Sequence, residues 1–289
     1  MPQKNHLEKA SKQINNFFDN LGPKVYRKID LKNILDNHSD EWHLENQTSL
    51  EHFIKYARKI IPLKKVQLAF PNRPHVRYIS GACSIYEVTQ SLKEEGYFSH
   101  HTAAEIHDLL GADDQIFFNF EQQMRSQSSG EMTQDAINRA FHNKARISQN
   151  KAKYKNYTIW LLNGKNTGCY GVIKFSGNLR VTNIARTLID MTVRPSYSGG
   201  PLQILQAYRR GIKKVDGETI VQTLAKLGHR YPYHQVIGFY METAGFSEKD
   251  LALLKNIPMK LDFYVDYQMV EPLYSSTWKL YYPAILRNA

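Results

Sequence analysis

The sequence predicts an α+β protein with an N-terminal winged helix-turn-helix, followed by a mixed α/β, largely helical C-terminal domain. Two observations lead to this prediction. Three amphipathic helical segments precede a two-stranded pattern within residues 1–80, and helical segments alternate with short strands in the rest of the chain. Because 289 residues suffice for about two domains, we place them at residues 1–80 and 81–289.

The N-terminal region begins with helical periodicity. Apolar residues recur at spacings of three and four over 7–21, which predicts a helix that ends at the following Gly-Pro pair. Asp30 is suited to cap a short second helix over 31–37. A capping-box sequence at 48–51 then opens a third helix, whose apolar stripe continues to residue 61.

A hairpin pattern follows the third helix. From Lys64 the period of apolar residues changes to two, and a Pro-Asn-Arg-Pro turn at 71–74 separates two alternating runs. Three helices and a hairpin are the order of a winged helix-turn-helix, in which helix three can enter the major groove and the wing can reach phosphates. The loop over 37–47 is longer than the turn usual in that motif.

Basic and polar side chains on the third helix and the hairpin predict an interface for double-stranded DNA. The predicted contacts are His52, Lys55, Tyr56, Arg58, Lys59, Lys64, Lys65, Arg73, His75 and Arg77.

The distribution of charge agrees with a polyanionic partner. Lys and Arg total 38 against 27 Asp and Glu, a net charge of +11. Residues 1–80 hold 14 against 8, a net of +6, so this segment is more basic per residue than the rest, which holds 24 against 19. A second basic stretch over 139–155 contains six cations and no acidic residue, and it is either a nucleic-acid contact or an exposed linker.

Other features narrow the class of protein. Cys83 and Cys169 form no Cys-x-x-Cys pair, which argues against a disulfide framework and a cysteine-based zinc site. No apolar run approaches the roughly 18 residues of a membrane span, and the start of the chain lacks the apolar core of a secretory signal. The sequence therefore predicts a cytoplasmic protein with no membrane contact, no metal and no cofactor.

The C-terminal region shows strands and then helices. Strands are predicted at 157–162 and 170–175 with a turn at Asn163-Gly164 between them, and another strand at 261–267. The intervening Gly-Lys loop lacks the order of a phosphate loop, so no nucleotide site is predicted there. The predicted helices span 184–191, 201–212, 216–227, 232–244 and 247–254.

Four runs of this region resemble the central signature of the AbiEi family, the antitoxins of type IV abortive-infection toxin–antitoxin systems. They are 186–195, 231–240, 261–264 and 278–283. Tyr197, 199–200 and 205–209 are similar to the same signature, and upstream 96–100 and 162–168 are similar to the family too. The resemblance covers roughly positions 84 to 285, whereas the segment 1–80 is similar to the family in architecture more than in sequence. Ala185 departs from the family pattern, in which an acidic residue is expected.

The resemblance implies two activities. The N-terminal winged helix would bind inverted repeats in the promoter of its own operon and repress it. The C-terminal domain would counteract a neighbouring toxin of nucleotidyltransferase type and restrain a phage-defence system, with direct contact between the two proteins left open. Candidate residues for antitoxicity are Arg186, Asp190, Arg194, Tyr231, Tyr233, His234 and Gln235.

Structural roles are the alternative for these candidates. Arg186 and Asp190 are four positions apart on one helix, where they can form an ion pair, and the Tyr231–Gln235 turn can belong to the core. Two other functions also stay open. One is a transcription factor without a toxin partner, and the other is a metal-dependent nuclease built from Asp190, His234, Asp262, Asp266 and Glu271. The prediction is that the protein is not an enzyme.

Overall fold

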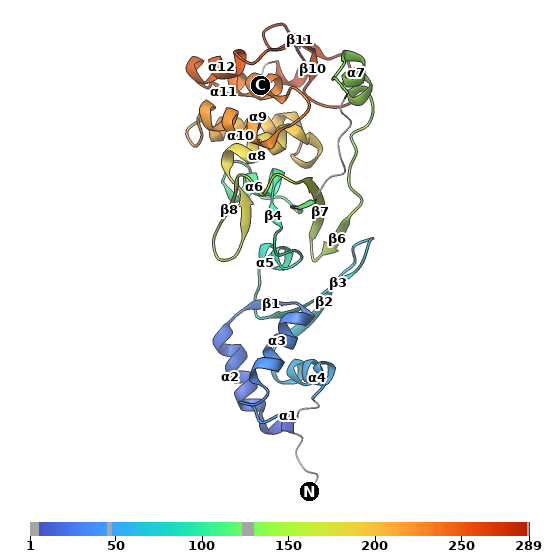
Figure 1. The fold of residues 1–289 in the computed structure, drawn as a ribbon, viewed down its shortest axis with the longest axis vertical. Helices are drawn as coiled ribbons and strands as arrows, with labels where there is room; N and C mark the ends of the chain where they lie inside the picture. The colour runs from blue at the N-terminus through green and yellow to red at the C-terminus, as the bar shows by residue number, and fades with distance from the viewer. Residues whose placement is uncertain (1–5, 45–47, 123–129, 288) are drawn as a thin grey trace. The chain divides into compact units, whose positions relative to one another are not determined.

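The chain is a mixed α+β protein that divides into two compact units (Figure 1). The computed structural model describes residues 6–44, 48–122, 130–287 and 289. The smaller unit comprises residues 1–94 and 150–157, and the larger unit comprises residues 95–149 and 158–289.

The smaller unit contains short helices and a three-stranded sheet. Its elements are α1 (His6–Lys9), α2 (Ser11–Leu21), β1 (Lys24–Tyr26), α3 (Lys28–His38), α4 (Leu50–Ile60), β2 (Leu63–Leu68), β3 (His75–Ser80), α5 (Ile85–Gln90) and β6 (Lys151–Tyr154).

The three predicted helices are present with local differences. The first is divided into α1 and α2 at Ala10. The cap of α4 is displaced by one residue from the predicted capping box at 48–51, because Ser49 is the N-cap and its hydroxyl accepts the backbone N–H of His52. Asp30 was expected to cap α3, but Arg27 is the N-cap residue. Asp30 lies in the first turn, where its carboxylate accepts the backbone N–H of Arg27 at 2.7 Å and so stabilises the same helix end. Residues 45–47 of the predicted long loop lie outside the described residues.

The predicted hairpin forms an antiparallel pair, β2 with β3, to which β1 adds a third strand in the order β1-β3-β2. The sequence did not predict β1, because so short a strand cannot show an alternating pattern. The helices and one face of this sheet enclose a core with aromatic side chains at Phe18, Tyr26, Trp42 and Phe53. Trp42 stacks on Phe53 with ring centroids 5.9 Å apart.

The smaller unit extends beyond the predicted boundary at residue 80. Helix α5 contacts β1, and the Arg77 guanidinium on β3 donates hydrogen bonds to the hydroxyl and carbonyl of Ser91 at 2.9 and 2.8 Å. Strand β6, far along the chain, contacts β2. Sequence patterns do not reveal such contacts between distant segments.

The larger unit combines a sheet, a group of helices and a second small sheet. Its elements are β4 (Tyr97–Phe98), α6 (His100–Ile106), β5 (Gln115–Gln122), α7 (Gln134–His142), β7 (Tyr157–Lys165), β8 (Val172–Lys174), β9 (Arg180–Thr182), α8 (Ile184–Val193), η1 (Pro195–Tyr197), α9 (Pro201–Gly211), α10 (Gly217–Leu227), α11 (Tyr233–Ala244), α12 (Glu248–Lys255), β10 (Phe263–Tyr264), β11 (Leu273–Ser275), β12 (Leu280–Tyr282) and η2 (Ala284–Leu286).

Strands β7, β5, β4, β9 and β8 lie in this order in the main sheet, with β5 parallel to β7 and β4 parallel to β9. The predicted turn at Asn163-Gly164 is wrong, since β7 continues through both residues to Lys165. Gly164 is required there because a Cβ atom would lie 2.7 Å from Nδ2 of Asn119 on the neighbouring strand. The glycine therefore permits a close approach within the sheet.

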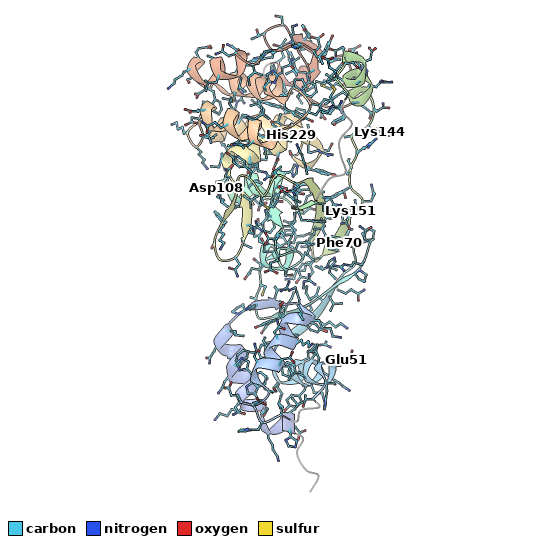
Figure 2. The ribbon with its side chains drawn as sticks, in the orientation of Figure 1. Glu51, Phe70, Asp108, Lys144, Lys151 and His229 are labelled. Carbon is cyan, nitrogen blue, oxygen red and sulfur yellow. The ribbon has the colours of Figure 1, made fainter. Side chains whose placement is uncertain are left out.

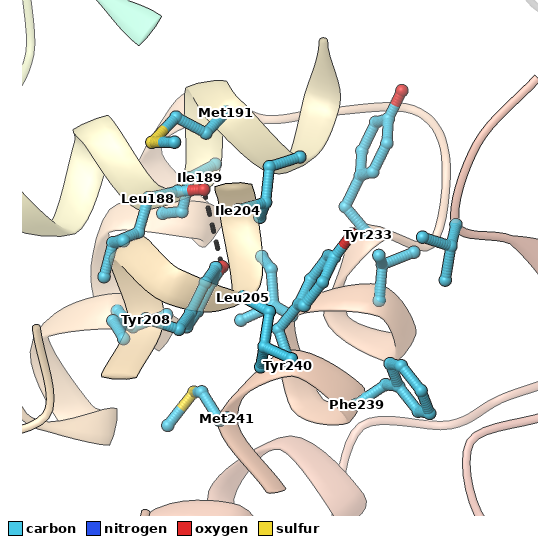
Figure 3. Close-up of a cluster of buried hydrophobic side chains, with 14 of the residues drawn as sticks. Leu188, Ile189, Met191, Ile204, Leu205, Tyr208, Tyr233, Phe239, Tyr240 and Met241 are labelled. Carbon is cyan, nitrogen blue, oxygen red and sulfur yellow. Dashed lines mark hydrogen bonds between the residues drawn. The ribbon is translucent and has the colours of Figure 1, made fainter. Parts of the chain in front are cut away.

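The helices of the larger unit enclose its main core (Figure 3). Tyr208 on α9 stacks on Tyr240 of α11 at 5.4 Å, and its hydroxyl donates to the carbonyl of Leu188 on α8 at 3.4 Å. On α11, Gly238 faces the Trp278 ring so closely that a Cβ atom would lie 2.1 Å from it. The predicted helices are confirmed in place, and Gly228 and Gly245 are left-handed C-caps of α10 and α11.

The predicted strand at 261–267 is reduced to β10, which pairs in parallel with β12, and β11 completes that small sheet. The basic stretch over 139–155 comprises the end of α7, a connecting segment and β6. No helix among the described residues is both long and apolar enough to cross a membrane.

Candidate functional site

Helix α4 and the hairpin of the smaller unit carry the first candidate surface. Phe53, Ile54 and Ala57 bury one face of α4 in the core, and the opposite face and the adjoining strand expose cations. We call these side chains the basic surface: Lys55, Arg58, Lys59, Lys64, Lys65 and Arg73. Within the part of the chain that the structure describes, none of the six forms an ion pair. This concentration of uncompensated positive charge suits a polyanion.

The remaining predicted DNA contacts differ in exposure. His52 is exposed on α4, and Tyr56 is half-buried against the core. His75 and Arg77 are buried, with 9% and 6% of their surfaces exposed. They alternate with Val76 and Tyr78, which face the core, so they lie on the opposite face of the sheet. Neither side chain is available to DNA in this conformation, and their prediction as direct contacts is wrong.

Burial also changes the acid–base behaviour of these two residues. Burial, together with the nearby charges of Arg77 and Arg73, lowers the pKa of His75 to about 4, which keeps its imidazole neutral. Burial and the charge of Arg27 lower the pKa of Arg77 to about 10, and Arg77 still remains protonated at neutral pH. Hydrogen bonds from Arg77 to Ser91 and to the Val76 carbonyl satisfy its guanidinium.

The second candidate site is centred on Arg186 of α8, which is only 3% exposed. Its Nη2 donates to the Tyr97 hydroxyl at 2.7 Å and to Oε1 of Glu121 at 3.2 Å. Its Nε lies 3.4 Å from Oδ2 of Asp190, which gives the ion pair that the spacing on the helix allowed. The guanidinium also lies 4.9 Å from the centre of the Tyr97 ring. The sequence did not point to Tyr97 or Glu121, because both come from distant strands.

The carboxylate of Glu121, a residue of β5, is bound by the loop that follows β7. It accepts the backbone N–H groups of Thr167 at 2.6 Å and Cys169 at 3.0 Å, and the Thr167 hydroxyl also donates to it. Burial alone would raise the pKa of Glu121, but these hydrogen bonds and Arg186 hold it below its ordinary value. The backbone N–H groups of this Gly-Lys loop are therefore directed at a carboxylate of the protein itself.

Asp190 is the second carboxylate beside Arg186, and its side chain is 13% exposed. Burial raises the pKa of Asp190 to about 6, and the positive charge of Arg186 opposes this shift. We call Tyr97, Asn119, Glu121, Thr167, Arg186 and Asp190 the Arg186 network. It connects α8 with β4, β5 and the loop after β7.

His229, in the connection between α10 and α11, is a residue of this region that the sequence did not single out (Figure 2). Its ring lies 5.5 Å from the Tyr233 ring, and its buried Nε2 atom has no hydrogen-bond partner among the described residues. Burial and the positive charges of Lys165, Arg186 and Arg194 lower its pKa to about 4. No local pattern identifies His229, because its surroundings come from β7, α8 and α11.

The remaining antitoxicity candidates differ in their surroundings. Arg194 is exposed, and its Nη1 donates to the Arg146 carbonyl at 3.5 Å. Tyr231 and Tyr233 pack on Phe263, with ring centroids 5.8 and 5.3 Å apart, so both contribute to the core.

Gln235 is fully buried, and its Nε2 donates to the carbonyls of Leu261, Trp278 and Lys279. It therefore fastens α11 to the small sheet. His234 is 8% exposed, and its buried Nε2 has no hydrogen-bond partner in the described ranges.

The residues considered for a metal-dependent nuclease do not assemble. Among the described residues, no group of three or more His, Cys, Asp or Glu side chains is placed to hold a metal ion. Asp262 accepts a hydrogen bond from the Tyr274 hydroxyl at 2.7 Å, and Asp190 pairs with Arg186.

Fold and sites together define a mixed α+β protein with a basic surface on one unit and a buried ionic network in the other. No family profile matches the sequence, and no curated protein matches it. The structure is similar to the crystal structure of the Rv2827c protein from Mycobacterium tuberculosis, with a TM-score of 0.60. That similarity covers 96% of this chain and 91% of the other at 12% sequence identity, so it shows a shared fold alone.

Proposed function

We propose that the protein binds double-stranded DNA at inverted repeats in the promoter of its own operon and represses transcription. The observation that carries this proposal is the basic surface, whose six exposed cations form no ion pairs among the described residues. Phosphate contacts from Lys and Arg supply much of the affinity of proteins for DNA, because they release condensed counterions.

The order of elements in the smaller unit supports a winged helix-turn-helix. Helices α2, α3 and α4 precede the β2–β3 hairpin, as in that motif. Helix α4 would then enter the major groove, with Lys55, Arg58 and Lys59 on its exposed face, and Arg73 would reach the backbone from the turn of the hairpin. His75 and Arg77 would support the hairpin from its covered face.

An antitoxin role is the second part of the proposal. The four runs in the larger unit that resemble AbiEi antitoxins support neutralisation of a neighbouring nucleotidyltransferase toxin in a type IV system. Three of the runs meet in the core, where Gln235 of the second run donates to carbonyls of the third and fourth. Arg194, at the end of the first run, is the exposed candidate for this activity.

Fluorescence anisotropy with labelled DNA from upstream of the operon tests the first part. We expect Lys55→Ala combined with Lys59→Ala to weaken binding about ten- to a hundredfold, as for the loss of two phosphate contacts. The slope of log K against log salt should also fall in magnitude by about 1.8. The matched control is Lys9→Ala with Lys12→Ala, which removes the same charge from exposed positions on α1 and α2. Equal affinity of the two double variants would refute the assignment of the interface.

Growth rescue tests the second part. The full chain is expressed together with the neighbouring nucleotidyltransferase, and the proposal requires that it restores growth. Arg194→Ala should reduce rescue without changing DNA affinity, whereas Arg209→Ala, at an exposed position on α9, should leave both unchanged. DNA binding without any rescue would favour a transcription factor that has no toxin partner.

A further inference from the structure

The basic stretch over 139–155 is divided between the two compact units. Its first three cations belong to the larger unit, whereas the last three, Lys151, Lys153 and Lys155, lie in the segment 150–157 of the smaller unit. Only the second half of the stretch therefore accompanies the unit that carries the basic surface.

Strand β6 holds this second half against the strand that also contacts helix α4. Both α4 and β6 contact β2. Along β6, Ala152 is 4% exposed and Tyr154 is half-buried, whereas Lys151 and Lys153 are exposed. Because successive side chains of a strand point to opposite faces, Ala152 and Tyr154 face the protein, and the two lysines face solvent. Lys155 follows the strand, and its Nζ lies 5.4 Å from the centre of the Tyr154 ring.

Strand β2 joins the positive charge of α4 to that of β6. Lys65 stands opposite Tyr78, which belongs to the core under the helices, and Lys64 lies on the other face of the sheet. The segments 62–80 and 139–155 contain no acidic residue, so no carboxylate from β2, β3 or β6 offsets these charges. Three contacting elements thus expose lysines without an acidic residue on either of the two strands.

We propose that β6 is a second DNA-contacting element of the smaller unit, in which Lys151 and Lys153 bind phosphates beside those bound from α4 and β2. We call these two side chains the β6 lysines. The inference rests on the proposed binding of promoter DNA and extends its interface to a segment far along the chain. An ammonium on a long flexible stem suits a phosphate as a point charge with three donors. Such contacts position the protein on the duplex and read no bases.

Fluorescence anisotropy of the full chain with promoter DNA tests the inference. Lys151→Gln combined with Lys153→Gln should weaken binding about ten- to a hundredfold, as for the loss of two phosphate contacts. The slope of log K against log salt should fall in magnitude by about 1.8. The matched control is Arg139→Gln with Lys144→Gln, which removes the same charge from exposed positions of the same basic stretch in the larger unit. This control should bind as the parent does.

Hydroxyl-radical footprinting distinguishes a local contact from a general effect of charge. Loss of the β6 lysines should remove protection from a few backbone positions and leave the rest of the footprint intact, whereas a general loss of charge would weaken all of it. Lys153→Gln alone is the variant to interpret if the change at Lys151 disturbs the strand, because Lys153 forms no ion pair within the described part of the chain. Its salt slope should fall by about 0.9.

The outcomes separate this inference from the proposal on which it rests. If the parent binds promoter DNA and the variant without the β6 lysines binds equally tightly with the same salt slope, β6 does not contact DNA, although the DNA-binding proposal stands. An equal loss of affinity in the matched control, or a uniformly weaker footprint, would likewise overturn the role of β6. Absence of any binding by the parent would overturn both.

Discussion

Replacement of Arg186 by Met should destabilise the larger unit more than any other single change to a charged residue of the Arg186 network. Met keeps much of the aliphatic volume and removes the guanidinium. The Arg186 side chain is 4% exposed, and those of Glu121 and Asp190 are 7% and 13% exposed, so water cannot replace the lost partner.

The magnitude follows from what remains after the substitution. Glu121 keeps the backbone N–H groups of Thr167 and Cys169, whereas Asp190 loses the cation with which it pairs and must take up a proton or remain charged in a dry site. Removal of one member of a buried ion pair costs about 3–5 kcal/mol, which is a large part of the roughly 5–15 kcal/mol that stabilises a typical domain.

Urea denaturation of the parent, Arg186→Met and a control measures this loss. The control is Arg209→Met, at an exposed position on α9, and its free energy of unfolding should stay within about 0.5 kcal/mol of the parent value. Addition of Glu121→Gln and Asp190→Asn to Arg186→Met should recover part of the loss, because the stranded charges are then absent. A loss below about 1 kcal/mol for Arg186→Met would refute the reasoning that the network is dry and mutually dependent.

Three further predictions concern single residues. The pKa of Asp190 is raised from 3.8 to about 6, so its contribution to stability is full below about pH 4 and is lost, by on the order of 3 kcal/mol, as the pH rises through 6. Asp190→Asn should remove this part of the pH dependence of the unfolding free energy. A variant with the same pH dependence as the parent would contradict the prediction. Gly238→Ala should lower the stability of the protein by about 1–3 kcal/mol, because the new Cβ would overlap the Trp278 ring. The control is Gly111→Ala, whose Cβ meets open space, and equal melting temperatures for the two variants would refute this packing argument. Arg77→Met should lower stability by about 2–4 kcal/mol through loss of its buried hydrogen bonds to Ser91 after α5, with the salt dependence of DNA binding unchanged; a smaller salt slope would place Arg77 on the DNA.

Local signals in the sequence identified most helices correctly. The apolar stripe and the capping residues placed α4, and the left-handed glycines placed the ends of α10 and α11. Helix caps and periodicity depend on neighbours close along the chain, so one sequence contains the information. The exposed cations of α4 were predictable for the same reason, because the face opposite an apolar stripe is solvated.

Features that depend on distant contacts were not predictable. The alternating pattern of the hairpin predicts that the Arg77 side chain is exposed, yet it is buried against Ser91. Asn163-Gly164 has the sequence pattern of a turn, although Gly164 lies inside a strand, where the close approach of Asn119 requires a glycine. The domain boundary differs for the same reason, since β6 joins the smaller unit from far along the chain.

By itself, the sequence determined most of the helices, several of their caps, the concentration of positive charge in the segment 1–80 and the spacing that allows Arg186 to pair with Asp190. Only the tertiary structure added Tyr97 and Glu121, which are 89 and 65 residues from Arg186 along the chain, and brought Lys165 to the carbonyls beside His229. The physical reason is that local order arises from short-range sterics and periodic burial. The environment of a buried charge is instead set by whichever distant segments pack around it.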